Sequence, residues 1–163
     1  MGCSHLIIDG FNVIHALENL KSLLMNGKMD VACSKLVEMA HCIHDNQPNL
    51  RTTVVFDGNG PQIDVQHPSP DQFTFSVIFS PNDSSADSVI RRIVTNSKAP
   101  QLTCIATQDL LLANSLAHLK PHVLSHSDLL ELYQRAQKLQ CAAITSTHKT
   151  ATKGWSNSFE DFF

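Results

Sequence analysis

Four aspartates in this chain fall at the ends of elements that the sequence predicts, in positions suited to binding a metal ion. Asp9 and Asp57 directly follow apolar strands, and Asp109 follows another strand after two residues. Asp87 falls in the first turn of a predicted helix. The carboxyl ends of parallel strands and the amino ends of the helices that follow them share one edge of a sheet. We therefore expect the four carboxylates to converge at that edge.

Carboxylates that lie close together favour the binding of a divalent metal ion. Like charges held close together raise one another's pKa, and a divalent cation is the natural compensation. Oxygen ligands favour Mg²⁺ or Mn²⁺, and no cluster of cysteines and histidines in the sequence points to zinc. A bound ion of this kind polarises a phosphodiester, lowers the pKa of an attacking water and neutralises the leaving oxygen. The pattern predicts nuclease chemistry, and a metal would let a chain of net charge −3 bind an anionic substrate.

Each aspartate also has a purely structural interpretation. Asp87 follows Ser84 by three residues, as in a Ser-x-x-Asp capping box, and Asp109 can cap the helix that it precedes. Either cap would be worth about 1 kcal/mol. Asp9-Gly10 and Asp57-Gly58 have the composition of ordinary turns. The metal-site prediction therefore rests on the shared edge and not on any single aspartate.

Strands and helices alternate along the chain and position these aspartates. Leu6-Ile7-Ile8 is an apolar run typical of a parallel strand buried on both faces, and Phe73–Phe79 alternates like a half-exposed edge strand. We expect Gly10 to let the backbone turn sharply and Asn12 to cap the helix that follows. The pattern predicts an α/β fold, a three-layer, mostly parallel five-stranded sheet with helices on both faces. The expected strands span residues 6–8, 52–56, 73–79, 102–106 and 122–124, and the expected helices 13–24, 31–43, 86–94, 110–119 and 128–138.

The 163 residues suffice for one domain with a substantial core. We place this domain at residues 1–138 and expect residues 139–163, rich in Ser, Thr and Lys, to form a flexible tail. The proline-rich residues 58–72 predict a long loop that is functional or mobile. The aromatic and acidic end, Phe159–Phe163, predicts a disordered terminus or a strip packed on the domain, and the alternative is a peptide that docks to a partner.

Composition and missing motifs exclude several classes of protein. No apolar run is long enough to span a membrane. The five cysteines are an odd number without Cys-x-x-Cys spacing, which indicates reduced thiols in a cytoplasmic protein. Neither Gly-x-Gly-x-x-Gly nor a P-loop sequence occurs, so a dinucleotide or P-loop nucleotide site is not expected.

Several motifs resemble, in order and spacing, the signature of YacP-like NYN domains, which belong to the PIN-like nuclease superfamily. The most specific are the opening Asp9-Gly-Phe-Asn12 and the block Ser85-Ala-Asp87. Val-Val-Phe-Asp57 and Ile-Ala-Thr107-Gln-Asp109 complete the set. The resemblance covers about residues 5–135, nearly all of the predicted domain.

The resemblance implies a compact domain that cuts RNA endonucleolytically with Mg²⁺ or Mn²⁺, in bacteria sometimes in association with ribosomes. The RNA would be mRNA, rRNA or tRNA, and the process ribosome-associated mRNA decay. Carried over by matching positions, the implied metal ligands are Asp9, Asp87 and Asp109, with Asp57 as a weaker candidate. Asn12 would orient a ligand or water, and Ser85 and Thr107 would be hydroxyls behind the ligands.

Two departures from the family pattern keep other functions open. Ser88 and Arg91 stand where relatives often carry acids, and the chain lacks the long basic C-terminal helix that some relatives carry. A cation such as Arg91 weakens a second metal site or binds a substrate phosphate. One rival function is an RNA- or ribosome-binding module without catalysis. The other is a Mg²⁺-dependent phosphatase, which lacks support because Phe11 replaces the second acid of an Asp-x-Asp nucleophile pair.

Overall fold

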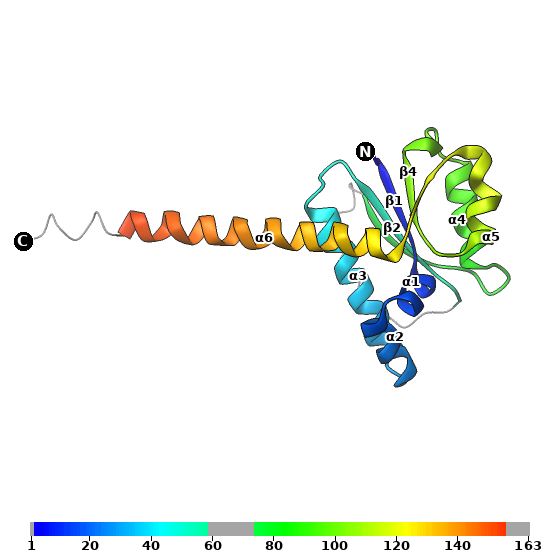
Figure 1. Ribbon diagram of the computed structural model, residues 1–163, viewed down its shortest axis with the longest axis horizontal. Helices are drawn as coiled ribbons and strands as arrows, with labels where there is room; N and C mark the ends of the chain where they lie inside the picture. Colours follow the sequence, from blue (N-terminus) through cyan, green and yellow to red (C-terminus); the bar gives the residue numbers. More distant parts are fainter. Residues whose placement is uncertain (1, 59–73, 156–163) are drawn as a thin grey trace, which may run out of the picture.

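A computed structural model describes residues 2–58 and 74–155, with side chains described as far as residue 144. Its centre is a five-stranded sheet with the order β3-β2-β1-β4-β5, in which every neighbouring pair is parallel (Figure 1). The chain therefore has the α/β fold expected from the sequence. The strands are β1 (His5–Asp9), β2 (Arg51–Phe56), β3 (Phe75–Phe79), β4 (Thr103–Ala106) and β5 (His122–Leu124).

The strand patterns follow from position in the sheet. All five residues of β1 are buried, because this strand has a neighbour on each side and helices on both faces. β3 lies at an edge and is half-buried over four of its five residues, as its alternating sequence predicts. The N-terminal strand is thus the central one, and Asp9 ends in the middle of the sheet.

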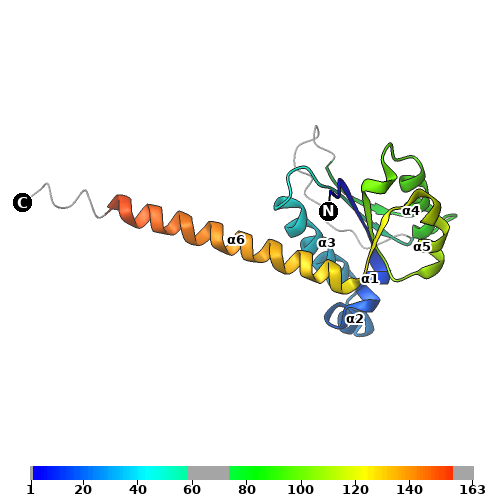
Figure 2. The ribbon, with the colours of Figure 1, turned by 45° about the horizontal axis from the view of Figure 1, so that its top comes forward.

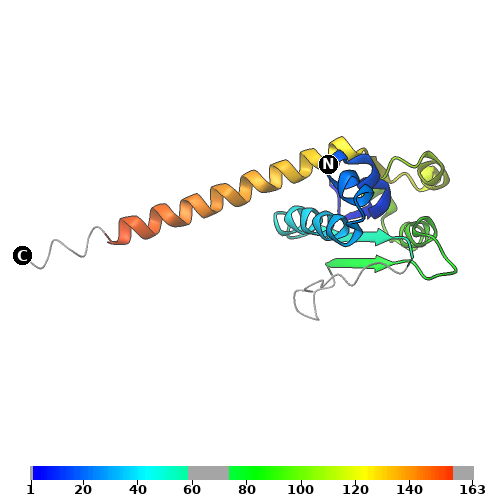
Figure 3. The ribbon, with the colours of Figure 1, turned by 90° about the horizontal axis from the view of Figure 1, so that it is seen from below.

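The helices form a layer on each face of the sheet. Leu6 and Ile8 point into one core, shared with α3 (Met29–Asp45), while Ile7 points into the other, shared with α4 (Ala86–Thr95) and α5 (Leu110–Leu116). In all three views α4 and α5 lie together on one side, and α1, α2, α3 and α6 lie on the other (Figures 1, 2 and 3). Short 3-10 turns at Pro100–Leu102 and Ala117–Leu119 precede β4 and β5.

The first helical segment differs from the expected single helix. It is divided into α1 (Gly10–Ala16) and α2 (Glu18–Met25) by Leu17, which has extended backbone angles. Leu17 is itself buried, and the break lets both short helices pack against α3. The helix also begins earlier than predicted, at Gly10, so Asn12 lies inside α1 and is not its cap.

The last helix is longer than the sequence predicts. α6 begins at His126 and ends at Trp155 instead of Lys138, and its distal half extends well beyond the rest of the molecule (Figure 1). The Ser, Thr and Lys content of this segment suggested a tail, but it contains no Pro or Gly between Leu139 and Lys153 to stop a helix. The chain therefore has a long C-terminal helix, whereas the sequence predicted one that ends at Lys138; whether it counts as the basic helix of some relatives stays untested. The domain boundary at residue 138 stays a prediction.

Two expectations fall outside the described residues. The long loop predicted for residues 58–72 lies there apart from Gly58, and so does the aromatic and acidic segment Phe159–Phe163. Among the described helices, none has the length and apolar character needed to cross a membrane.

Candidate active site

The four aspartates lie along the carboxyl edge of the sheet. Asp9 ends the central strand β1, Asp57 follows β2, Asp87 is in the first turn of α4, and Asp109 precedes α5. Their charges influence one another: those of Asp57 and Asp87 raise the pKa of Asp9, and that of Asp109 raises the pKa of Asp87. The structure thus places all four aspartates along this edge, where their charges act on one another, without clustering them as metal ligands.

Asp9 is the most enclosed of the four. Only 5 % of its surface is exposed, and its Oδ2 accepts a hydrogen bond from Thr107 Oγ1 at 2.9 Å. Burial raises the pKa of Asp9 from 3.8 to about 6, with the charges on Asp87 and Asp57 adding to the rise and the bond from Thr107 opposing it. A buried carboxylate among other carboxylates is an uncompensated negative charge.

Gly10 makes this position of Asp9 sterically possible. A Cβ atom on Gly10 would lie 2.3 Å from Cδ1 of Phe56 and 2.9 Å from the carbonyl oxygen of Val55. The phenyl ring of Phe56 is fully buried and packs between Phe11 and Phe79, with ring centroids 5.4 and 5.3 Å apart. The glycine is therefore required for close approach of α1 to β2.

Thr107 and Asn12 tie the loop after β4 to the central strand and α1. The hydroxyl of Thr107 donates to Asp9 and accepts a hydrogen bond from the backbone N–H of Asp109 at 3.1 Å. The amide oxygen of Asn12 accepts from the backbone N–H of Gln108 at 2.8 Å. These bonds fix Asp109 relative to Asp9, so both predicted polar residues position the acidic edge.

Asp57 joins the end of β2 to the start of α4. Its Oδ1 accepts a hydrogen bond from the backbone N–H of Ala86 at 2.7 Å, while its side chain is otherwise exposed. Gly58 follows with a φ of 69°, a conformation that favours glycine, and its N–H donates to Ser80 Oγ at 2.9 Å. Asp57 therefore holds the amino end of α4 beside the sheet edge.

The cap of α4 differs from the predicted capping box. Ser85, and not Ser84, is the N-cap, and its Oγ accepts from the backbone N–H of Ser88 at 3.2 Å. Because the helix begins one residue later than the box requires, the carboxylate of Asp87 is not used as a cap. Partial burial and the charge of Asp109 raise the pKa of Asp87, and Arg91 opposes the rise.

Arg91 lies next to the acidic edge on the following turn of α4. Its Nη2 is 4.0 Å from Asp87 Oδ2, which is a long ion pair, and its Nε donates to Ser115 Oγ at 2.9 Å. The side chain is 43 % exposed, and its other N–H groups have no partner among the described residues. Ser115 could not be identified from the sequence, because this residue lies on α5 and its contact with α4 is purely tertiary.

Asp109 is the N-cap of α5, as one interpretation of the sequence predicted. Its Oδ1 accepts from the backbone N–H groups of Leu111 at 2.7 Å and Leu112 at 3.2 Å. Asp57 and Asp109 thus each use one carboxylate oxygen to begin a helix. The charge of both side chains still acts on Asp87.

The donor set fits a hydrated divalent ion better than a closed metal cage. Within residues 2–58 and 74–155, no three acidic, histidine or cysteine side chains are grouped closely enough to hold an ion by themselves. Mg²⁺ commonly binds through one or two carboxylates and keeps several waters. Asp9 and Asp87 are the carboxylates most available for this, because among the described residues no side-chain capping bond is found for Asp9 at the start of α1 and Ser85, not Asp87, caps α4.

A comparison with protein families supports this interpretation of the fold. Residues 6–161, almost the whole chain, match the model of the YacP-like NYN domain. The chain belongs to this family. The YacP-like NYN domain is a PIN-like nuclease domain, and nucleases of this kind typically use divalent metal ions. The resemblance seen in the sequence motifs is confirmed.

Two solved structures are similar to this NYN domain. The crystal structure of Rae1 (YacP) from Bacillus subtilis is 25 % identical, with a TM-score of 0.68 over 93 % of this chain and 87 % of that chain. Its W164L mutant is 23 % identical, with a TM-score of 0.65 over 88 % of this chain and 84 % of that chain. No match was found among curated proteins.

Proposed function

We propose that this chain is a metal-dependent endoribonuclease that hydrolyses RNA phosphodiester bonds at the carboxyl edge of its sheet. The observation that carries the proposal is the environment of Asp9, a buried carboxylate whose pKa is raised to about 6 among three further aspartates. A fold places such a group at a sheet edge at an energetic cost, and perturbed carboxylates cluster at functional sites. Membership of a nuclease family points to the same chemistry.

We assign different roles to the residues of this edge. Asp9 and Asp87 would hold Mg²⁺ or Mn²⁺ directly, and Asp57 and Asp109 would contribute their second oxygens or their charge. When bound, the ion lowers the pKa of the attacking water and neutralises the leaving oxygen. Asn12 and Thr107 keep Asp109 in place, and Ser85 keeps the first turn of α4 in place.

Arg91 would bind a phosphate oxygen of the RNA. It has a stable partner in Ser115 and a half-exposed guanidinium with unused donors beside the acids. In this proposal the protein acts in the cytoplasm on mRNA, rRNA or tRNA, in association with ribosomes, as its resemblance to YacP-like NYN domains implies. The net charge of −3 makes the ion and Arg91 the attractive groups for this substrate.

The test is cleavage of a mixed, end-labelled RNA pool by the wild-type protein and by Asp9→Asn, with Mn²⁺, Mg²⁺ or EDTA. We expect metal-dependent cuts and a loss of at least about 100-fold in rate for the variant, the scale for removing a group that stabilises transition-state charge. The matched control is Asp30→Asn, because Asp30 is an exposed aspartate in the first turn of α3, away from the sheet edge.

Two other results would replace the proposal. RNA binding that survives EDTA, with no cleavage at any metal concentration, would show the non-catalytic RNA- or ribosome-binding module; Arg91 beside Asp87 is the observation that favours this rival. Hydrolysis of a small phosphomonoester in preference to RNA would show the Mg²⁺-dependent phosphatase.

A further inference from the structure

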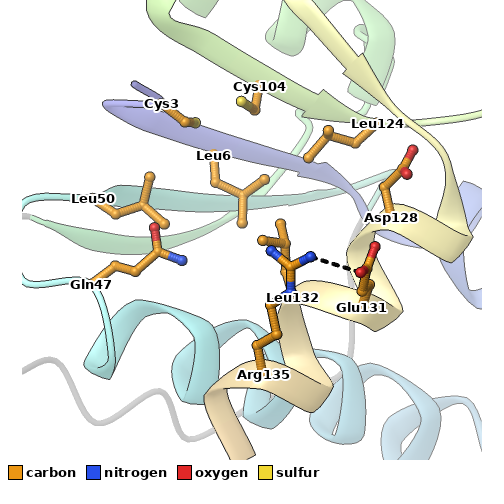
Figure 4. A pocket seen from close by; sticks show the side chains of 10 residues that line it. All are labelled: Cys3, Leu6, Gln47, Leu50, Cys104, Leu124, Asp128, Glu131, Leu132 and Arg135. Atoms are coloured by element: carbon orange, nitrogen blue, oxygen red, sulfur yellow. Dashed lines mark hydrogen bonds and ion pairs between the residues drawn. The ribbon is translucent and has the colours of Figure 1, made fainter. Parts of the chain in front are cut away.

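Two cysteines face the same cavity, away from the acidic edge. A cavity of about 170 Å³ lies between the sheet and α6, and Cys3 and Cys104 line it together with leucines of the core. Figure 4 shows the two thiols side by side on one wall, with the ion pair of Arg135 and Glu131 from α6 on the opposite side. A cavity of this size has room for a molecule much larger than water.

The backbone holds the segment that contains Cys3 beside the start of β4. β1 and β4 are neighbours, with Leu6 in register with Cys104. Immediately before β1, the N–H and Oγ of Ser4 donate to the carbonyl oxygen of Leu102 at 2.9 and 3.3 Å, which fixes the segment of Cys3 against the start of β4. Cys3, three residues before Leu6, and Cys104 thus lie on neighbouring segments at the same end of the sheet.

The two thiols also affect each other's ionisation. Cys3 Sγ lies 3.5 Å from the carbonyl oxygen of His5. Interaction with the Cys104 thiol lowers the pKa of Cys3 from 9.0 to about 7, despite the opposing effect of burial. By contrast, burial raises the pKa of Cys33 to about 11 and also raises that of Cys42. Cys3 is therefore the better nucleophile at neutral pH.

We propose that Cys3 and Cys104 are a peroxide-reactive thiol pair that closes to a reversible disulfide. The geometry assigns the roles: Cys3 is partly exposed and attacks, whereas Cys104 is only 4 % exposed and resolves. This site is independent of the proposed nuclease activity, because it lies at the amino ends of β1 and β4, and Asp9 lies at the other end of β1.

The reaction balances with hydrogen peroxide as the oxidant. The Cys3 thiolate attacks one peroxide oxygen, so an S–O bond forms, the O–O bond breaks, and the departing hydroxide takes a proton to become water. The sulfur of Cys104 then attacks the sulfur of this sulfenic acid and loses its proton, so an S–S bond forms and the S–O bond breaks with release of a second water. Two thiols lose two electrons, and one peroxide is reduced to two waters.

The experiment uses the full chain, reduced, desalted and treated with increasing hydrogen peroxide. Trypsin releases Cys3 in residues 1–21 and Cys104 in residues 99–135, because the bond between Lys120 and Pro121 is not cut, and each peptide contains a single cysteine. We expect non-reducing mass spectrometry to find these two peptides linked, with loss of two thiols per molecule and full reversal by dithiothreitol. The oxidised protein should have a higher Tm, because the bond closes a long loop in the unfolded chain.

Variants separate the pair from general oxidation. Cys3→Ser and Cys104→Ala should each abolish the linked peptide, and Cys104→Ala should leave Cys3 as a sulfenic acid that dimedone traps. Cys141→Ser is the matched control, because Cys141 is exposed on α6, and it should leave the link unchanged. Linkage of Cys3 to another cysteine, or oxidation of Cys141 before Cys3, would overturn the proposal. Circular dichroism confirms that each variant is folded.

Discussion

Buried polar groups at the two ends of the sheet differ in charge, although β1 and β2 contribute to both ends. At the amino end, His5 Nε2 bonds Thr53 Oγ1 at 2.9 Å, and Thr53 bonds Ser76 at 3.1 Å, so neutral groups link three strands. Burial lowers the pKa of His5 to about 4, which keeps this network uncharged at neutral pH. At the carboxyl end, Asp9 is equally buried but is ionised at neutral pH with a pKa of about 6. The amino end is organised for stability, and the carboxyl end retains charge at the expense of stability.

The largest effect on stability should come from the tight packing beneath the charged end. Gly10→Ala places a Cβ against the buried ring of Phe56, which cannot move because it packs against Phe79. We expect a loss of about 3 kcal/mol in the free energy of unfolding, measured by urea denaturation. The control at the opposite end of the strand is Gly2→Ala, where no atom lies within 4 Å, and it should change nothing. Equal stability of the two variants would contradict the close approach of α1 and β2.

The two ends should also respond to pH with opposite signs. The pKa of Asp9 is raised by folding from 3.8 to about 6, so the folded state binds more protons between these values and stability falls as pH rises. The pKa of His5 is lowered by folding from 6.5 to about 4, so its contribution is complete above 6.5 and is lost as pH falls toward 4. Each effect is on the order of 3 kcal/mol.

Single variants separate the contributions of Asp9 and His5 to the pH dependence of stability. In EDTA, Asp9→Asn should gain stability relative to the wild type as pH rises from 4 to 7, because the buried charge is gone. In His5→Gln, stability should no longer fall as pH is lowered toward 4. The decrease in stability with rising pH that Asp9 causes should remain. The measurement is the Tm of the three proteins across this pH range. If the three curves of Tm against pH were parallel, burial would not give Asp9 and His5 opposite effects on stability.

A smaller effect tests the neutral network directly. Thr53→Val keeps the shape of the side chain but removes the hydroxyl that joins His5 to Ser76. We expect a loss of about 1–2 kcal/mol, because buried polar atoms are left without partners. Adding His5→Leu should recover part of this loss, since two apolar replacements remove both partners. Chemical denaturation of the single and double variants measures the coupling, and strictly additive losses would argue against the network.

The smallest stability effect separates the two uses of Asp109. Asp109→Ala removes the cap of α5 and should cost about 1 kcal/mol, whereas Asp109→Asn keeps a capping oxygen and should cost little. Under the proposed function both variants lose RNA cleavage, because both lose the charge. Thermal unfolding and the cleavage assay on the same preparations separate the two roles. An active Asp109→Asn would restrict Asp109 to helix capping.

Much of the fold is predictable from sequence because its signals are local. Leu6-Ile7-Ile8 indicates a central buried strand by itself, and the rule that parallel strands end at one edge then brings Asp9 and Asp109 together. The break at Leu17 was not predictable in this way, because it depends on how two helices share the surface of α3. The helix beyond Lys138 was missed because a polar composition resembles that of a tail.

The candidate site was predictable only in part, because some of its contacts depend on tertiary packing and not on local sequence. The positions of the aspartates follow from the strand pattern, but their partners are tertiary: Asn12 bonds the amide of Gln108, and Arg91 bonds Ser115. The pairing of Cys3 with Cys104 likewise depends on the order of strands in the sheet. The roles of Asp9, Asp57, Asp87 and Asp109 as metal ligands stay predictions.

The central position of β1 has a consequence for folding during synthesis. β1 is translated first, yet its neighbour β4 begins only at Thr103. At a translation rate of about 5–20 residues per second, β4 is synthesised on the order of 5–20 s after β1. Long-range pairing of this kind is also intrinsically slow. The acidic edge is incomplete until Asp109 has left the ribosome, so the nascent chain cannot assemble its candidate site early in translation.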